Sequence, residues 1–250
     1  MLEFAIRLGK KAGEYLQEHL THDVEVGHKG RIDLVTNIDR GSQALIVEEI
    51  ERTFPSHSIL AEEGFRKDGG SPFTWIIDPL DGTVNYVHRI PFFCVSIAVF
   101  KSGEPYLGVC FNPISGDLFW AQAGKGAYLH NTRIAVSSTA SLIDSLVVTG
   151  FPYVHDEIEA VITRFSRIIR KAQAVRRFGS AALDLCFVAK GSIDAYWEVG
   201  LKPWDIAAGV VVLLEAGGMV TALDGSPFDL SKGDLLASNT RVHDELKKLM

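Results

Sequence analysis

The sequence predicts a mixed α/β fold, α+β in its local pattern, with helices layered on sheets. Three observations predict it: amphipathic helices near the N-terminus, short strands separated by turns in the middle, and strands alternating with helices toward the C-terminus. The chain has 250 residues, of which 47% are hydrophobic and 22% are charged, so it can bury a large core. We therefore expect one compact unit or two lobes packed together.

Two helices are expected to cover a sheet. In residues 2–20 the apolar side chains recur close to one helical face, which predicts an amphipathic helix. A second helix is predicted over about residues 41–54, because Pro55 ends the helical pattern. A short apolar strand at residues 75–77 then places Asp78 at its carboxyl end.

The middle of the chain has the pattern of an antiparallel meander, and the remainder alternates strands with helices. Meander strands are expected at residues 93–99, 107–111, 118–121 and 127–129, separated by turns rich in Gly, Asn and Pro. Later strands are expected at residues 146–149, near 175, at 195–197 and at 219–222. Helices are expected at 157–171, 181–189, 205–217 and the C-terminus.

Composition argues against several classes of function. The chain carries 31 acidic and 25 basic residues, a formal net charge of -6 without a basic block, which disfavours a nucleic-acid-binding or membrane-binding surface. No apolar run approaches the length of a membrane span, and no signal-peptide core follows the N-terminus, so we expect a cytoplasmic protein. Cys94, Cys110 and Cys186 lack CxxC pairing, which favours buried thiols over a zinc site or disulfides.

The most informative segment is Asp78–Thr83, with the sequence DPLDGT. Two acidic residues leave a buried strand, and Gly82 permits a tight turn after them. Carboxylate oxygens are hard ligands that suit Mg²⁺, which leaves other coordination positions for water and substrate phosphate. The segment predicts a site where a cation meets a phosphate, although Asp78 and Asp81 alone are as consistent with turn residues.

Two further acidic clusters are candidates for the same site. Taken alone, Glu62 and Glu63 before a glycine favour a solvated loop, and Asp205 at the start of an apolar helix favours an N-cap. The three clusters together favour a metal site over these separate interpretations.

These segments closely resemble the signatures of the inositol monophosphatase family, whose superfamily includes fructose-1,6-bisphosphatase. The likeness covers nearly the whole chain and is carried by DLVTNID at 33–39, AEEG at 61–64, WIIDPLDGTVNYVH at 75–88, and WDIAAG at 204–209 continuing to EAGG at 215–218. The resemblance implies an αβαβα sandwich with two or three Mg²⁺ ions. It assigns the metals to Glu62, Asp78, the backbone carbonyl of Leu80, Asp81 and Asp205.

The resemblance also assigns roles in the reaction. The family's catalytic residues are matched by Thr83, Asp39 and the metal ligand Glu62. By this resemblance, Thr83 and Asp39 would orient or deprotonate the attacking water. Their alternative roles are a cap of the turn for Thr83 and an N-cap of the second helix for Asp39. The expected substrate contacts are Asp81, Gly82, Thr83, Ala181 and Glu198, where Glu198 is also consistent with a solvent-exposed charge at a strand end.

The chain is accordingly divided into two lobes that share one active site. The N-terminal α+β lobe, residues 1–140, carries Glu62 and the Asp78–Thr83 segment, and the C-terminal α/β lobe, residues 141–250, carries Glu198 and Asp205. The family's mobile-loop lysine is replaced by His28, next to Lys29, which leaves that loop's contacts open. Arg176 and Arg177 fit a second phosphate, a dimer interface or a solvated strand edge.

The function expected is Mg²⁺-dependent hydrolysis of a small phosphate monoester, inositol 1-phosphate first, by a lithium-sensitive homodimer. The alternative substrates are fructose 1,6-bisphosphate, a nucleotide 3'-phosphate such as adenosine 3',5'-bisphosphate, and NADP. The absence of a long insertion favours a small polyol or sugar phosphate over the larger ones. A haloacid dehalogenase-type phosphatase has one residue between its acids, whereas Pro79 and Leu80 stand between them here. A non-enzymatic regulator with this fold is the remaining alternative.

Overall fold

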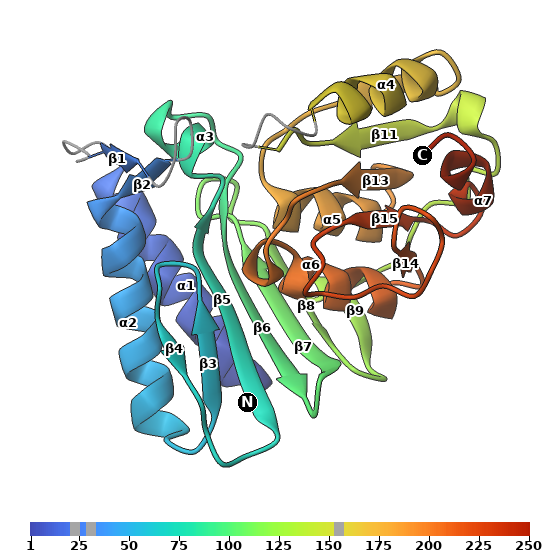
Figure 1. Ribbon diagram of the computed structural model, residues 1–250. Coiled ribbons are helices and arrows are strands. Elements are labelled where there is room, and N and C mark those ends of the chain that lie inside the picture. Colours follow the sequence, from blue (N-terminus) through green and yellow to red (C-terminus); the bar gives the residue numbers. More distant parts are fainter. Residues whose placement is uncertain (21–25, 29–33, 153–157) are drawn as a thin grey trace.

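The chain folds into five alternating layers of helix and sheet, an αβαβα sandwich (Figure 1). The computed structural model describes residues 1–20, 26–28, 34–152 and 158–250. Two helices cover an eight-stranded sheet, two central helices separate it from a five-stranded sheet, and two outer helices cover the far side. The predicted fold class is confirmed.

The first layer consists of α1 (Leu2–His19) and α2 (Asn37–Thr53). Helix α2 starts at Asn37, earlier than the predicted start at residue 41, because Thr36 and Asp39 form a capping box. The Thr36 hydroxyl accepts from the Asp39 amide at 3.3 Å, and the Asp39 carboxylate accepts from the Thr36 amide at 2.8 Å. Asp39 is therefore the third residue of the helix, and the N-cap expected there is Thr36.

The second layer is a sheet whose strands run in the order β10-β9-β8-β7-β6-β5-β3-β4. All neighbours from β5 to β10 pair antiparallel, which confirms the predicted meander, whereas β3 pairs parallel to β5. The bounds are β3 Ser58–Ala61, β4 Arg66–Lys67, β5 Phe73–Asp81, β6 Cys94–Lys101, β7 Glu104–Phe111, β8 Leu118–Gln122, β9 Gly126–Leu129 and β10 Thr132–Ile134. Strand β6 is buried on both faces because helices cover both sides of the sheet.

A small antiparallel ribbon and a short helix lie at one end of this sheet (Figure 1). The ribbon joins β1 (Val26–His28) to β2 (Leu34–Thr36), and α3 (Thr83–Val87) follows directly after β5. The loop between β1 and β2, which includes Lys29 and Asp33, lies outside the described residues. The contacts expected of the His28 side chain therefore stay a prediction.

The central layer consists of α5 (Ala181–Ala189) and α6 (Pro203–Glu215). Helix α5 has the predicted bounds. Helix α6 starts at Pro203, before the predicted start at Asp205, because proline is favoured in the first helical turn, where its missing N–H has no helical acceptor. Both helices contribute to one apolar core that also contains side chains from both sheets, such as Ala98 and Tyr196.

The fourth layer is a sheet with the strand order β12-β11-β13-β15-β14, and α4 (Ile158–Ile169) and α7 (His243–Lys247) cover its outer face. The bounds are β11 Leu146–Thr149, β12 Ala174–Arg176, β13 Ala195–Glu198, β14 Met219–Thr221 and β15 Leu235–Ser238, with a 3-10 turn at Leu142–Asp144. Strand β11 pairs parallel to β12 and β13, while β15 pairs antiparallel to β13 and β14. The sequence patterns did not predict β15, which lies between β13 and β14 in this sheet.

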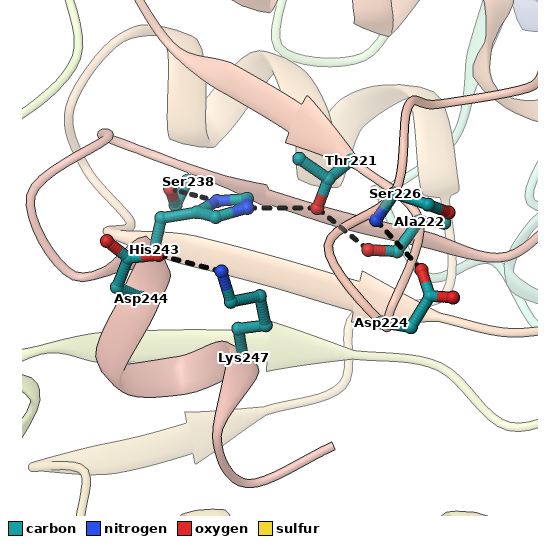
Figure 2. Close-up of polar contacts among 8 residues, drawn as sticks. All are labelled: Thr221, Ala222, Asp224, Ser226, Ser238, His243, Asp244 and Lys247. Carbon is teal, nitrogen blue, oxygen red and sulfur yellow. Dashed lines mark hydrogen bonds and ion pairs between the residues drawn. The ribbon is translucent and has the colours of Figure 1, made fainter.

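A buried histidine fixes α7 on this sheet (Figure 2). His243 is 3% exposed and contacts Ser238 through Nδ1 and Thr221 through Nε2, each at 2.9 Å. The Thr221 hydroxyl already donates to the carbonyl of Ala222, so it accepts from Nε2–H, and Nδ1 accepts from the Ser238 hydroxyl. The neutral ring satisfies both contacts, and burial lowers the pKa of His243.

Among the described residues, no helix combines the length and apolar character that a membrane span requires.

Candidate active site

The residues singled out by sequence converge on one cavity of about 100 Å³ between the carboxyl end of β5, the start of α5 and the end of β13. We call it the acidic cavity, because six carboxylates and one arginine line it. Its charged lining residues are Glu62, Asp78, Asp81, Arg177, Asp184, Glu198 and Asp205. The cavity is also lined by Leu80, Gly82, Thr83 and Ala181, so every residue assigned above to metal or substrate borders it. Asp39 does not line the cavity but is hydrogen-bonded to Thr83, which does.

A β-bulge brings Asp78 and Asp81 to the same cavity. Side chains three apart in a regular strand point to opposite faces. Here Asp78 pairs with Ser96 and Asp81 with Cys94, so β5 has one more residue than β6 between these pairs. The extra residue restores a common direction for the two carboxylates, and Pro79 fits this position because a bulge leaves a residue without its ladder partner.

Gly82 ends the strand in a left-handed conformation, with φ 97°, and α3 begins at Thr83. A Cβ at Gly82 would lie 3.1 Å from the Cβ of Phe93 and 3.2 Å from the carbonyl oxygen of Gly179. Both the torsion and the close packing therefore require glycine at the point where the chain turns into the cavity.

Thr83 and Asp39 form a hydrogen-bonded pair across α2 and α3. The Thr83 hydroxyl donates to Asp39 Oδ1 at 3.0 Å and also lies 3.2 Å from the carbonyl oxygen of Leu80. Asp39 is fully buried, and this burial raises its pKa, while hydrogen bonds from Thr36 and Thr83 act in the opposite direction. Asp39 therefore caps α2 and orients Thr83 at the same time.

The start of α5 holds the carboxylate of Asp81. Asp81 accepts hydrogen bonds from the Ser180 hydroxyl at 2.5 Å and from the amides of Ala182 at 2.8 Å and Ala181 at 3.3 Å. The Cys94 thiol lies 3.9 Å from the same carboxylate. Burial raises the pKa of Asp81 to about 6 despite these bonds.

The remaining acids are anchored by backbone amides of their own segments. Asp78 accepts from the Leu80 amide at 3.0 Å, and Asp205 accepts from the Lys202 amide at 2.7 Å as the third residue of α6. Burial raises the pKa of both groups well above the ordinary value, and repulsion from Glu62 raises both further. Such mutual repulsion is relieved when a cation binds between the acids.

The donor set fits magnesium. Among the described residues, no three His, Cys, Asp or Glu side chains already form a complete metal-binding group. Mg²⁺ does not require one, because it usually binds through one or two carboxylates and keeps several waters. Glu62, Asp78, Asp81 and Asp205 supply hard oxygens, and the Leu80 carbonyl oxygen retains a second lone pair beside its contact with Thr83.

Glu198 lies in the opposite wall. Tyr196 donates its hydroxyl to Glu198 Oε2 at 2.5 Å, and a Cβ at Gly150 would lie 2.0 Å from Oε1, so the carboxylate rests directly on that glycine. Burial raises the pKa of Glu198 to about 7. Glu198 is thus partly buried at the end of β13 and lines the cavity, and its role in binding substrate stays a prediction.

Sequence reasoning missed Asp184 and Gly150 in this cavity. The signal for Asp184 was present, since it is the one charged residue of α5, whose sequence is AALDLCFVA. Gly150 gave no local signal, because its role depends on a contact with Glu198, which is distant in the chain. Of the arginine pair, Arg177 borders the cavity, and both side chains are exposed.

Two proteins of known name are similar to this chain over most of its length. An inositol-1-monophosphatase of Synechocystis is 48% identical over 231 residues, which cover 90% of this chain and 80% of that protein. The Nus factor SuhB of Pasteurella multocida is 40% identical over 250 residues, covering 98% and 94%.

Solved structures match over almost the whole chain. The extragenic suppressor protein suhB of Bartonella henselae has a TM-score of 0.96 at 35% identity, covering 99% of this chain and 96% of that one. The inositol monophosphatase of Anabaena has a TM-score of 0.89 at 42% identity, covering 99% and 94%. The staphylococcal IMPase-II with inositol monophosphate bound has a TM-score of 0.83 at 29% identity, covering 99% and 93%. The profile of the inositol monophosphatase family matches residues 1–249, and the chain belongs to this family.

Proposed function

We propose that this protein hydrolyses the phosphate monoester of a small polyol, inositol 1-phosphate first, in a magnesium-dependent reaction. The observation that carries the proposal is the convergence of Glu62, Asp78, Asp81 and Asp205 on one cavity beside the Thr83–Asp39 pair. Family membership supports phosphatase activity, and a bound inositol monophosphate in the staphylococcal relative supports the substrate.

The four acids and the Leu80 carbonyl would hold two or three Mg²⁺ ions. Magnesium, when bound, lowers the pKa of water and neutralises charge that develops on the phosphate. The acids of this chain supply the negative charge that draws the cations in, and the amides at the start of α5 keep Asp81 in place. The substrate phosphate then enters a cavity that would repel it without the cations.

Thr83 and Asp39 would orient the attacking water. Because the Thr83 hydroxyl donates to Asp39, its oxygen lone pairs can accept a hydrogen bond from the water. The proton of the water passes to Thr83 Oγ1 while the hydroxyl proton passes to Asp39, whose raised pKa favours its uptake. The water attacks phosphorus directly, the P–O bond of the ester breaks, and the leaving oxygen takes a proton from solvent to give the free alcohol.

The other wall of the cavity would bind the polyol. Glu198 Oε2 already accepts from Tyr196, so Oε1 is available for a substrate hydroxyl. Fructose 1,6-bisphosphate and nucleotide 3'-phosphates are alternative substrates, and the structure of staphylococcal IMPase-II with 2'-AMP bound supports a tolerant site. We further propose a cytoplasmic homodimer, inhibited by lithium, as the resemblance implies.

A regulatory function is the second candidate. It rests on one observation: several relatives at 39 to 41% identity are named Nus factor SuhB. The intact acidic cavity supports enzymatic activity beside it, since a pure scaffold gains nothing from mutually repelling carboxylates.

The test is phosphate release from inositol 1-phosphate, fructose 1,6-bisphosphate, adenosine 3',5'-bisphosphate and NADP, with Mg²⁺ and with excess chelator. The proposal expects the highest kcat/KM with inositol 1-phosphate and loss of release in chelator. Release in chelator at the full rate would contradict the magnesium site. No release from any ester would leave the regulatory function as the account of this chain.

A further inference from the structure

One acid of the cavity has no place in the machinery described so far. Asp184 lies one turn into α5, is 1% exposed, and lines the acidic cavity. Its Oδ1 is buried and accepts no hydrogen bond from any described residue. A buried acceptor without a donor is destabilising, and such oxygens in folded proteins are nearly always satisfied by a partner or a ligand.

Structural explanations for Asp184 are weak. It does not cap α5, because among the described residues no helix amide donates to its carboxylate, and the N-cap position is Ser180. Within the described part of the chain it forms no ion pair, although the positive charge of Arg177 acts on it. Burial raises the pKa of Asp184 well above its ordinary value, and the neighbouring acids Glu198 and Asp81 raise it further. The unsatisfied oxygen therefore points to a partner that arrives with the ligand.

The position of Asp184 selects the kind of partner. Ala181 and Asp184 lie on the same face of α5, because residues three apart are neighbours on a helix. Ala181 donates to Asp81 at the metal end of the cavity, so Asp184 lies one turn farther along, toward the wall that holds Glu198. A ligand whose phosphate occupies the metal end presents its alcohol part to this wall.

We propose that Asp184 is a specificity-determining residue that binds a second hydroxyl of the polyol, separate from the hydroxyl bound by Glu198. Asp184 and Glu198 both line the cavity, and in each carboxylate one oxygen, Asp184 Oδ1 and Glu198 Oε1, accepts no hydrogen bond from a described residue, so each can match one hydroxyl donor. The cavity thus selects a phosphate ester that carries at least two further hydroxyls. This inference rests on the phosphatase function proposed above.

The first test uses the unmodified protein with Mg²⁺, inositol 1-phosphate and its monodeoxy analogues. Removal of a recognised hydroxyl leaves a buried acceptor unpaired, so two different deoxy positions should each lower kcat/KM by about ten-fold or more. A series in which only one position matters would overturn the inference. This result does not depend on any variant folding.

The second test assigns each hydroxyl to its residue. Asp184→Ala should lower kcat/KM for inositol 1-phosphate by about ten-fold or more. In this variant, removal of one of the two recognised hydroxyls should no longer lower kcat/KM. In Glu198→Gln the same should hold for the other hydroxyl. Asp184→Asn, which keeps one carbonyl oxygen, should recover part of the loss. With p-nitrophenyl phosphate, which has no hydroxyl to bind, all three variants should lose less kcat/KM than with inositol 1-phosphate, and the exposed control Asp144→Ala should stay within about two-fold of the unmodified protein with both esters.

Other outcomes separate the possible failures. If Asp184 only holds Arg177, then Arg177→Ala would reproduce the loss and both deoxy effects would persist in Asp184→Ala, which overturns the inference. An equal loss on both esters, or a shift in the Mg²⁺ concentration for half-maximal rate, would also overturn it. If the unmodified protein released phosphate from no ester, the proposed function would fail first, and this inference with it.

Discussion

Asp78 and Asp81 stand three residues apart in β5, yet both carboxylates line the same cavity, because the strand carries one extra residue between them. A regular strand would send one of the two to the opposite face of the sheet. The bulge therefore turns an ordinary strand end into a pair of neighbouring hard ligands. It also explains why two residues, Pro79 and Leu80, separate the acids.

Asp81→Asn should abolish most magnesium-dependent activity, because it removes one negative charge from the cation site. We expect kcat/KM for inositol 1-phosphate to fall by about 100-fold or more. The exposed acid Asp244 offers a matched control, and Asp244→Asn should keep full activity. Phosphate release by Asp81→Asn at the unmodified rate would remove Asp81 from the site.

Ser180→Ala should weaken magnesium binding without removing a ligand. The Ser180 hydroxyl donates to Asp81 at 2.5 Å, and groups that orient a metal ligand typically change metal affinity by about 10- to 100-fold. The Mg²⁺ concentration for half-maximal rate should rise, while the maximal rate at saturating Mg²⁺ changes less. Ser115→Ala, in an exposed turn, is the control, and identical Mg²⁺ curves for both variants would contradict the role of Ser180.

Much of the site was predictable because its residues lie in contiguous segments. The Asp78–Thr83 segment combines strand, turn and acids within six residues, and α5 has a continuous apolar pattern, so both were located by sequence. The hydrogen bonds from the first amides of α5 to the Asp81 carboxylate were not predictable, because they join residues about one hundred positions apart. Strand β15 is a short apolar run of four residues whose partner strands lie far away in the chain.

Stability should depend on pH and magnesium together. Asp78, Asp81, Asp205 and Glu198 have raised folded-state pKa values, about 6 for Asp81 and about 7 for Glu198. The ordinary pKa values of these acids are 3.8 to 4.5. At a pH between those values and the raised ones, the folded chain binds more protons than the unfolded chain. The free energy of unfolding of the metal-free protein therefore falls as pH rises through this window.

Magnesium competes with those protons for the same oxygens. Scanning calorimetry should therefore show a lower Tm at pH 7.5 than at pH 5.5 without metal, and a rise of about 3 °C or more on adding Mg²⁺ at pH 7.5, with a smaller rise at pH 5.5. An equal Mg²⁺ effect at both pH values would show that these acids do not take up the metal.

His243→Leu should destabilise the protein without changing the reaction. The variant leaves Ser238 and Thr221 without their shared partner, which costs about 1–3 kcal/mol (Figure 2). Because the folded pKa of His243 is lowered, its contribution is complete above the ordinary value, 6.5, and falls as pH drops below it. Urea unfolding at pH 8 and pH 5.5 checks this, with Asp244→Ala as control. A loss that grows at low pH would contradict the neutral ring.

Direct attack by water is the central claim, and the stereochemistry at phosphorus tests it most directly. A substrate with a chiral, isotope-labelled thiophosphate group is hydrolysed in isotopic water, and the configuration of the released thiophosphate is determined. One in-line attack by water, oriented by Thr83 and Asp39, predicts inversion. Retention would reveal two successive displacements through an enzyme-bound phosphate, and would contradict the account.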